Sequence, residues 1–189
     1  MATTGRKKKG DKKCYVLMVS RYFAKDHIRA GAETFFVEKI FKARKKPVPY
    51  VTIDPKLHTV RLNYELWEKR FKEIDAGTAY LSLRYWLDKP YKSPQEEFLR
   101  LDNTHGIGIQ KLGFSLGVFI DDVDSDVGIH HIAKNDGLEW EDFKSWFGDV
   151  KYDSEYVIIH FTDFRYPNSL TEMDYKNFNY TYKNEKKKK

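Results

Sequence analysis

The apolar segments of this chain are mostly short, and they do not alternate regularly with helices. Residues 79–87 place every second side chain on one face, as a half-buried strand does, and residues 155–161 form a largely apolar run. A doubly wound parallel sheet requires regular alternation of strands and helices, so that architecture is disfavoured. The pattern predicts an α+β fold, built as a small, partly closed mixed β-barrel with peripheral helices.

Local signals set the remaining predicted elements. A helix over residues 64–75 is the clearest, because Asn63 is a favourable N-cap and Gly77 a favourable stop. A short helix is expected to follow Ser93-Pro94-Gln95-Glu96 and to end near residue 101, since this order supplies an N-cap, a first-turn proline and a capping-box partner. Further strands are predicted over residues 14–23, 48–53, 106–112 and 113–120, and further helices over residues 32–43 and 139–147.

The length of 189 residues favours one domain. The formal net charge is +6, and the two ends carry the excess: residues 1–13 hold +5 and residues 183–189 hold +4, which leaves the intervening part mildly acidic. Runs of like charge repel and stay solvated, so we predict two basic disordered tails around a single domain over residues 14–182. Such tails increase solubility, and they can also hold nucleic acid weakly through its phosphates.

Cys14 is the only cysteine, which excludes an intramolecular disulfide and a thiolate metal cluster. It precedes an apolar run, so we predict a buried structural thiol. The N-terminal sequence is basic but lacks the apolar stretch of a signal peptide, and no run approaches membrane-spanning length. We therefore expect a soluble cytoplasmic protein without membrane contact, and no motif indicates a cofactor.

Two polar clusters invite a metal interpretation that their spacing does not support. The acidic segment 121–126 is followed by Val127 and Ala133 where an EF-hand loop requires glycine and glutamate. His130 and His131 are adjacent, and adjacent side chains diverge on a strand and are poorly placed on a helix for a shared ion. We expect a solvated acidic loop, histidines in surface or capping roles, and no bound metal.

Aromatic and basic residues are interleaved over residues 84–92. Such a mixture can stack on nucleic-acid bases and hold phosphates. We therefore predict Arg84, Tyr91 and Lys92 as ligand-binding residues, whereas Trp86, on the alternating strand, is more typical of a core position.

The densest group of polar functions belongs to Lys56, His58, Thr59 and Arg61, which supply an amine, an imidazole, a hydroxyl and a guanidinium. A lysine of lowered pKa can accept the proton of a threonine hydroxyl, and a carboxylate such as Asp136 can orient that lysine. Arg61 can hold a carbonyl or phosphate oxygen. The alternative is ordinary polarity, because threonine and arginine are common in strands and a lysine after proline can point into water.

Strand geometry sets a condition on this hypothesis. Side chains alternate along a strand, so Lys56 and Thr59 would point to opposite faces if both lay on it. They can meet if Lys56 lies in a turn at Pro55 or if a bulge intervenes. We predict that Lys56 lies in the Pro55 turn.

The Lys56-x-x-Thr59-x-Arg61 segment resembles the Lys-x-x-Thr-x-Arg signature of the ASCH domain family. Residues 133–143 are similar to the family's segment in which an acidic residue precedes a helix, and residues 155–161 are similar to its closing strand. The resemblance implies a PUA-like β-barrel with a cleft suited to RNA or nucleosides.

The same resemblance implies a role for each matching residue. Some small bacterial ASCH proteins are amidohydrolases that remove the acetyl group from N4-acetylcytidine. By this similarity Lys56 would be the activating base, Thr59 the nucleophile and Asp136 the carboxylate, with Arg61 in the wall that binds an anion. Two residues depart from the family pattern: Asp136 stands where the amidohydrolases have the longer glutamate, and His58 replaces a small or apolar residue.

Two hypotheses follow. In the first, a PUA-like ASCH domain with an inserted helical elaboration around residues 63–105 binds RNA or a modified nucleoside in a cleft lined by lysine, threonine, arginine and aspartate, and amide hydrolysis there is less expected than binding alone. In the second, a non-catalytic protein-interaction or assembly module uses the acidic segment and the basic tails. An open pocket joining Lys56, Thr59 and Asp136 would favour the first hypothesis, and an occluded one the second.

Overall fold

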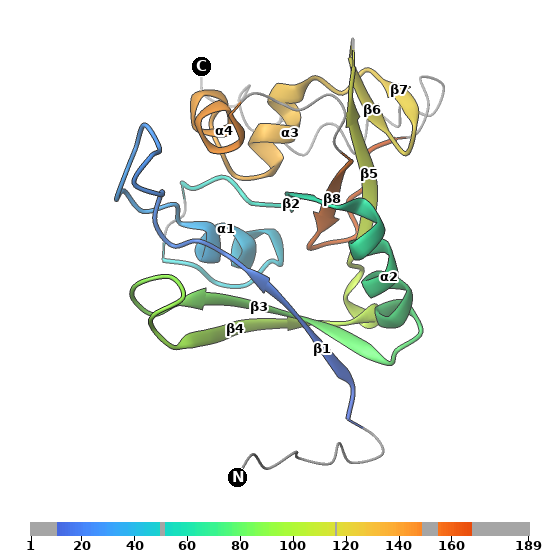
Figure 1. Ribbon diagram of the computed structural model, residues 1–189, viewed down its shortest axis with the longest axis horizontal. Coiled ribbons are helices and arrows are strands. Elements are labelled where there is room, and N and C mark those ends of the chain that lie inside the picture. Colours follow the sequence, from blue (N-terminus) through green and yellow to red (C-terminus); the bar gives the residue numbers. More distant parts are fainter. Residues whose placement is uncertain (1–10, 50–51, 116, 149–154, 168–189) are drawn as a thin grey trace.

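The computed structural model describes residues 11–49, 52–115, 117–148 and 155–167. Within these residues the strands form two separate sheets, and four α-helices pack around them (Figure 1). The architecture is α+β, as the sequence predicts. The described strands do not close into a single barrel.

The smaller sheet has three strands: β1 (Lys13–Met18), β3 (Ala79–Trp86) and β4 (Gln95–Leu101), in the order β1-β3-β4. β1 runs parallel to β3, and β4 runs antiparallel to it. Leu81 and Leu83 of the central strand are fully buried, so one face of this sheet forms the floor of the hydrophobic core.

The larger sheet contains the strand that carries the predicted site. Its strands, in spatial order, are β2 (His58–Leu62), β8 (Tyr156–His160), β5 (Gly108–Phe114), β6 (Val118–Ile120) and β7 (Val123–Ser125). All neighbours pair antiparallel. Every residue of β8 is buried, so this strand fixes the position of β2 from inside the core.

The helices are α1 (Phe36–Ala43), α2 (Tyr64–Asp75), α3 (Ile129–Asn135) and α4 (Trp140–Phe147), and a short 3-10 turn spans Asn103–His105. In Figure 1, α1 lies between the three-stranded sheet and the pair α3–α4, and α2 lies beside the larger sheet. α2 begins as predicted, because the Asn63 side chain accepts a hydrogen bond from the Leu66 N–H at 3.0 Å.

The helix predicted to end near residue 101 is wrong, because residues 95–101 form the edge strand β4. The capping signal is used differently: the Ser93 hydroxyl accepts from the Asp88 N–H at 3.0 Å and donates to the Lys89 carbonyl, which closes a turn. Leu99 and Leu101 are buried while Arg100 is exposed, so the segment has the alternation of a strand. Pairing with β3 outweighs the local helix preference here.

Other boundaries also differ from the prediction. The first strand ends at Met18 rather than near residue 23, and α1 begins at Phe36, where the Thr34 hydroxyl accepts from the Phe36 N–H at 3.2 Å. The described part of the predicted strand 48–53 contains no strand, and Tyr50 and Val51 lie outside the described residues. The short elements α3 and β7 were not predicted, since neither is long enough to show a periodic pattern.

The Cys14 prediction is wrong, because this thiol is exposed on β1. Most of the two basic tails lies outside the described residues, but Lys12 and Lys13 are described and contact the domain, at 3.7 Å from Asp102 and 2.9 Å from Glu73 respectively. Among the described residues, no helix has the length and apolar character needed to cross a membrane.

Candidate functional site

The segment that precedes β2 is held between two helices by its backbone. The Lys56 N–H donates to the Lys39 carbonyl of α1 at 3.0 Å, and the Leu57 N–H donates to the Asn135 carbonyl of α3 at 2.8 Å. Lys56 therefore lies outside the strand, which begins at His58. Because Lys56 is not part of the strand, the alternation of side chains along β2 does not set the direction of its side chain.

Lys56 and Asp136 form a buried ion pair. The ammonium group of Lys56 donates to a carboxylate oxygen of Asp136 and to the Asp136 main-chain carbonyl, and each residue is 2% exposed. Asp136 directly follows α3, and Gly137 next to it has a left-handed φ of 76°. A Cβ at Gly137 would lie 3.1 Å from the Lys56 Cβ, so the close approach of the two segments favours glycine.

Thr59 and Arg61 share one face of β2. The Arg61 guanidinium donates to the Thr59 hydroxyl at 2.6 Å, to the Val60 carbonyl at 2.8 Å and to the Met18 carbonyl of β1 at 3.0 Å. The second carboxylate oxygen of Asp136 lies 3.5 Å from the Val60 backbone nitrogen, at the limit of a hydrogen bond. The ion pair and the Thr59–Arg61 pair therefore meet at the backbone of β2.

Burial and neighbouring cations set the ionisation of this group. The pKa of Lys56 is lowered from 10.5 to about 8, chiefly by burial; nearby Arg61 and Lys39 act in the same direction, whereas Asp136 opposes the shift. Burial also lowers the pKa of Lys39, whose ammonium donates to the Gly137 carbonyl at 2.6 Å. The Lys56 ammonium and the Arg61 guanidinium thus share the carboxylate of Asp136 in a poorly solvated place. Lys39 lies nearby, and the carboxylates of Glu139, Asp54 and Asp142 also act on it.

The structure brings together Lys56, Thr59 and Arg61 from one segment of the chain with Asp136 from a second, distant one. Lys56 turns toward Asp136, while the Thr59 hydroxyl accepts from Arg61. Lys56, Thr59 and Asp136 are each 2% exposed, so they do not line an open cleft. This occlusion is the arrangement expected for the assembly-module hypothesis. A ligand of the first hypothesis would have to bind beside this group and not in a cleft lined by it.

A phenylalanine that sequence reasoning did not single out covers the ion pair. The Lys56 ammonium lies 4.2 Å from the centroid of the Phe36 ring, and that ring packs against Trp146 of α4 at 5.6 Å. The helical pattern indicates only that Phe36 is a core residue. Its place over Lys56, like that of Lys39, follows from how α1 packs in three dimensions.

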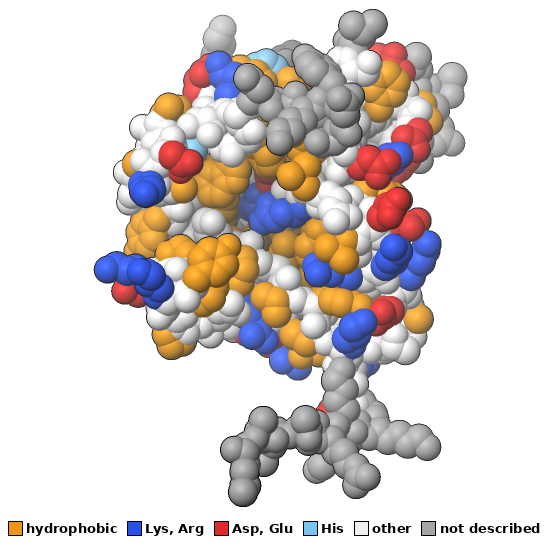
Figure 2. Space-filling model, viewed as in Figure 1, with side chains coloured by type: hydrophobic (Ala, Val, Ile, Leu, Met, Phe, Trp, Pro, Cys, Tyr) orange, Lys and Arg blue, Asp and Glu red, His pale blue; other side chains and the backbone are white. Residues whose placement is uncertain are grey.

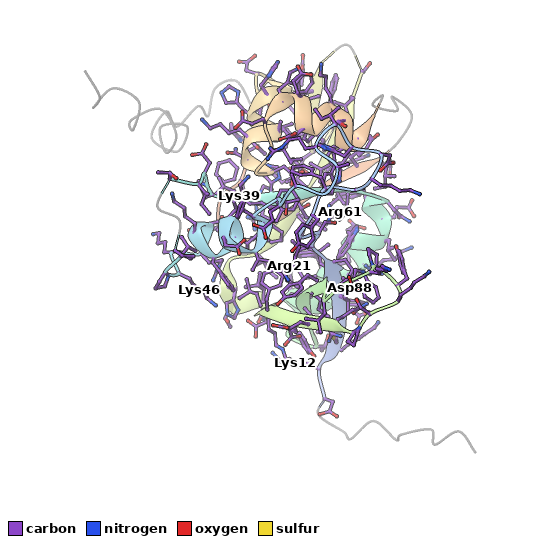
Figure 3. All side chains as sticks on the ribbon, turned by 90° about the vertical axis from the view of Figure 1, so that its left-hand side faces the viewer. Lys12, Arg21, Lys39, Lys46, Arg61 and Asp88 are labelled. Carbon is purple, nitrogen blue, oxygen red and sulfur yellow. The ribbon has the colours of Figure 1, made fainter. Side chains whose placement is uncertain are left out.

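Phe36 also lines a surface hollow on this side of the molecule. The hollow has about 230 Å³ of empty space, part of it open to solvent, and is lined by Arg21, Glu33, Phe35, Phe36, Val37 and Glu38. Figure 2 shows basic side chains set back among hydrophobic ones in the middle of the front face. Figure 3 turns the neighbouring side to the viewer and labels Arg21, Lys39 and Arg61 there.

His58, predicted to bind a ligand, lies on the opposite face of β2 and is fully buried. Its Nε2 is 2.9 Å from the Tyr166 hydroxyl, which also accepts from the Asn135 side chain at 2.9 Å. His160, across the strand pair, places its ring centroid 5.6 Å from that of His58. Burial lowers the pKa of both imidazoles well below 6.5.

The other predicted ligand-binding residues lie on β3 and on the hairpin that follows it. Arg84 donates to the Ser82 hydroxyl at 2.8 Å. Tyr91 is 90% exposed, and its ring centroid is 5.5 Å from that of Trp86. Lys92 is exposed. Within the described part of the chain, none of these three side chains contacts the Lys56 ion pair.

The clusters that invited a metal interpretation have local roles. The Asp121 carboxylate accepts from the Lys111 N–H at 2.8 Å and from the Gln110 side chain at 3.0 Å, which braces the β5–β6 hairpin. The His130 ring packs on Trp140, with centroids 4.4 Å apart. In the described ranges, no three histidine, cysteine or acidic side chains are grouped so that they could hold a metal ion.

Comparison of this chain with protein-family models, with curated proteins and with solved structures found no match.

Proposed function

We propose that this chain is an ASCH-like protein that binds RNA or a modified nucleoside at the face formed by Arg61, Lys39 and the Phe36 hollow. The observation that carries the proposal is that two cationic side chains, Lys56 and Arg61, share the one buried carboxylate of Asp136, with Lys39 close by. Unpaired positive charge in a poorly solvated place favours a ligand that supplies a negative charge or a strongly polarised oxygen. Phosphates and base carbonyls are such groups.

The proposal includes the fold that the resemblance implies. The β2-β8-β5 part of the larger sheet and the β1-β3-β4 sheet would be the two sides of a PUA-like barrel. Their connection through Arg61, which reaches from β2 to the Met18 carbonyl of β1, supports this arrangement. Residues 63–105, which hold α2, β3 and β4, would then belong in large part to the barrel itself rather than to a helical insertion.

Amide hydrolysis is a second candidate, and the ionisation of Lys56 favours it. A lysine whose pKa is about 8 is present partly as the free amine near neutral pH, and only the free amine can accept the proton of Thr59. The Arg61 guanidinium next to the Thr59 hydroxyl would stabilise an oxyanion that forms there. For this reaction Lys56 must leave Asp136, and the buried Thr59 hydroxyl must become accessible to the substrate.

The test follows binding and hydrolysis in the same samples. The full chain is mixed at low salt with N4-acetylcytidine and, separately, with short single-stranded RNA, and both affinity and release of acetate are measured. We expect binding of at least one ligand, weakened in Arg61→Gln and unchanged in the surface control Lys69→Gln, which removes an exposed cation of α2. Absence of binding to either ligand at low salt overturns the proposal. Full hydrolysis by Thr59→Ala would remove Thr59 as the nucleophile.

A further inference from the structure

The hollow beside Phe36 carries three charged side chains that have no ionic partner in the described part of the chain. Arg21, Glu33 and Glu38 line it, and none of them forms an ion pair there. The Arg21 guanidinium instead lies over two aromatic rings, 5.6 Å from the Tyr22 centroid and 5.2 Å from the Tyr85 centroid. A guanidinium stacked in this way is held in place while its N–H edge stays available.

Phe35 is kept in an unfavourable backbone conformation at the same hollow. It is the N-cap of α1 and has φ 56° and ψ 24°, in the left-handed region that bulky side chains rarely adopt. This conformation costs on the order of 1 kcal/mol, and glycine, which is also a good N-cap, would avoid the cost. The chain nevertheless places a half-buried aromatic ring here, on the wall of the hollow.

Phe36 connects the hollow to the Lys56 ion pair. It lines the hollow, and its ring centroid is 4.2 Å from the Lys56 ammonium. A group bound in the hollow would therefore lie next to a residue that contacts the cationic group. The two places can contact different parts of a single ligand.

We propose that this hollow is a base-binding subsite for a nucleobase that bears an exocyclic amino group. The base stacks on Phe35, the Arg21 guanidinium donates to a ring nitrogen or carbonyl, and the carboxylates of Glu33 and Glu38 accept from the amino group. The inference rests on the function proposed above, since the phosphates or polarised oxygen of the same ligand would reach Lys39 and Arg61. The base comes either from a free nucleoside or from an RNA strand.

The two carboxylates set the expected selectivity. An ionised carboxylate accepts hydrogen bonds and cannot donate them, so it favours a base edge rich in N–H groups. Adenine, cytosine and guanine each carry an amino group, whereas uracil presents carbonyl oxygens and a single ring N–H. A carbonyl oxygen against Glu33 or Glu38 would be repelled, and uracil should therefore bind least tightly.

The experiment titrates the full chain with adenosine, cytidine, guanosine and uridine, and with short single-stranded RNAs of each base, by calorimetry. The first variant is Phe35→Gly, which removes the stacking ring and also the unfavourable φ. We expect its affinity for the amino-bearing bases to fall about 5- to 150-fold, as loss of one base–aromatic stack predicts. Its thermal stability should be unchanged or higher. Lys45→Gly is the matched control, because Lys45 is exposed and has the same φ of 56° away from the hollow.

A second variant, which carries both Glu33→Gln and Glu38→Gln, tests the selectivity between bases. An amide can donate as well as accept, so the preference for amino-bearing bases over uridine should fall toward unity in the double variant, with uridine binding improved. If the unaltered chain binds nucleosides or RNA while Phe35→Gly binds them equally well, the subsite is wrong and the proposed function stands. If the unaltered chain binds none of these ligands, the proposed function itself fails. Binding of the RNAs without binding of the free nucleosides identifies the strand as the source of the base.

Discussion

The Lys56 ammonium donates to both the side-chain and the main-chain oxygen of Asp136, and the two side chains are at most 3% exposed. The contact joins the segment before β2 to the end of α3. Charges removed from water in this way are stable only when each keeps its partner. The pair therefore acts as a structural link as well as a candidate site.

Breaking this pair from one side should be costly. Lys56→Met or Asp136→Leu each leaves one buried charge without its partner, and we expect each to lower the free energy of unfolding by about 3 kcal/mol or more. The double variant should lose clearly less free energy of unfolding than the two single variants lose together. Urea unfolding of the three variants measures this coupling energy.

The surface pair Lys72–Glu68, at 3.0 Å on α2, is the control for that experiment. Both of its side chains are substantially exposed, so Lys72→Met should cost about 0.5 kcal/mol or less. A loss at Lys56 no larger than the loss at Lys72 would show that the buried pair contributes no special stability.

The low pKa of Lys56 predicts how stability changes at alkaline pH. Between pH 8 and 10.5 the folded chain has released the Lys56 proton, whereas the unfolded chain still holds it. The unfolded state then binds more protons, so the contribution of Lys56 to stability becomes more favourable as the pH rises through this window. Relative to Lys56→Met, the unaltered chain should gain about 3 kcal/mol across it.

The measurement compares the two proteins by chemical unfolding at several pH values from 7 to 10.5. Other groups titrate in both proteins and cancel in the difference; Tyr166, whose pKa burial raises, is one of them. A stability difference that stays constant with pH, or that moves in the opposite direction, would show that the pKa of Lys56 is not lowered.

The association of Thr59 with Arg61 could be foreseen from the sequence, because residues two apart on a strand share a face. The same rule places His58 on the other face, which the ligand-binding prediction for His58 did not take into account. Asp136 could be named only as a carboxylate able to orient a lysine, and the family resemblance then gave it a role, since no local pattern links it to a strand so far along the chain. Strand alternation thus explains why Thr59 and Arg61 meet, and tertiary packing explains why Lys56 and Asp136 join them.

Phe36 and Lys39 illustrate what a single sequence does not reveal. Both have ordinary positions on an amphipathic helix, and their role near Lys56 depends on the angle at which α1 crosses the segment before β2. The strand at residues 95–101 was missed for a related reason. Its capping signal is local, whereas its pairing with β3 is a long-range interaction that only the folded chain provides.

The buried histidines predict a loss of stability in acid. Burial holds the pKa of His58 and His160 well below 6.5, so below about pH 6.5 the unfolded chain binds protons that the folded chain does not. Stability should therefore fall as the pH drops. Neither ring nitrogen of His160 has a hydrogen-bond partner among the described residues, so His160→Leu should stabilise the fold by about 1 kcal/mol at pH 7.5 and by more at pH 5.

Thermal and urea unfolding at pH 7.5 and pH 5 check this prediction. His131→Leu is the comparison variant, because it removes a histidine whose side chain is exposed. A His160→Leu protein that loses as much stability on acidification as the unaltered chain would assign the acid sensitivity to other groups.

The exposed ring of Tyr91 predicts a contact to RNA that can be separated from stability. Because Tyr91 is 90% exposed, Tyr91→Ala should change the free energy of unfolding by less than about 0.5 kcal/mol. If the hairpin stacks on a base, affinity for single-stranded RNA should fall about 5-fold or more, while affinity for a free nucleoside held in the Phe36 hollow should stay the same. Leu87→Ala, 49% exposed on the same hairpin, is the control for lost apolar surface. Equal RNA affinity in Tyr91→Ala and the unaltered chain would show that RNA does not stack on this hairpin.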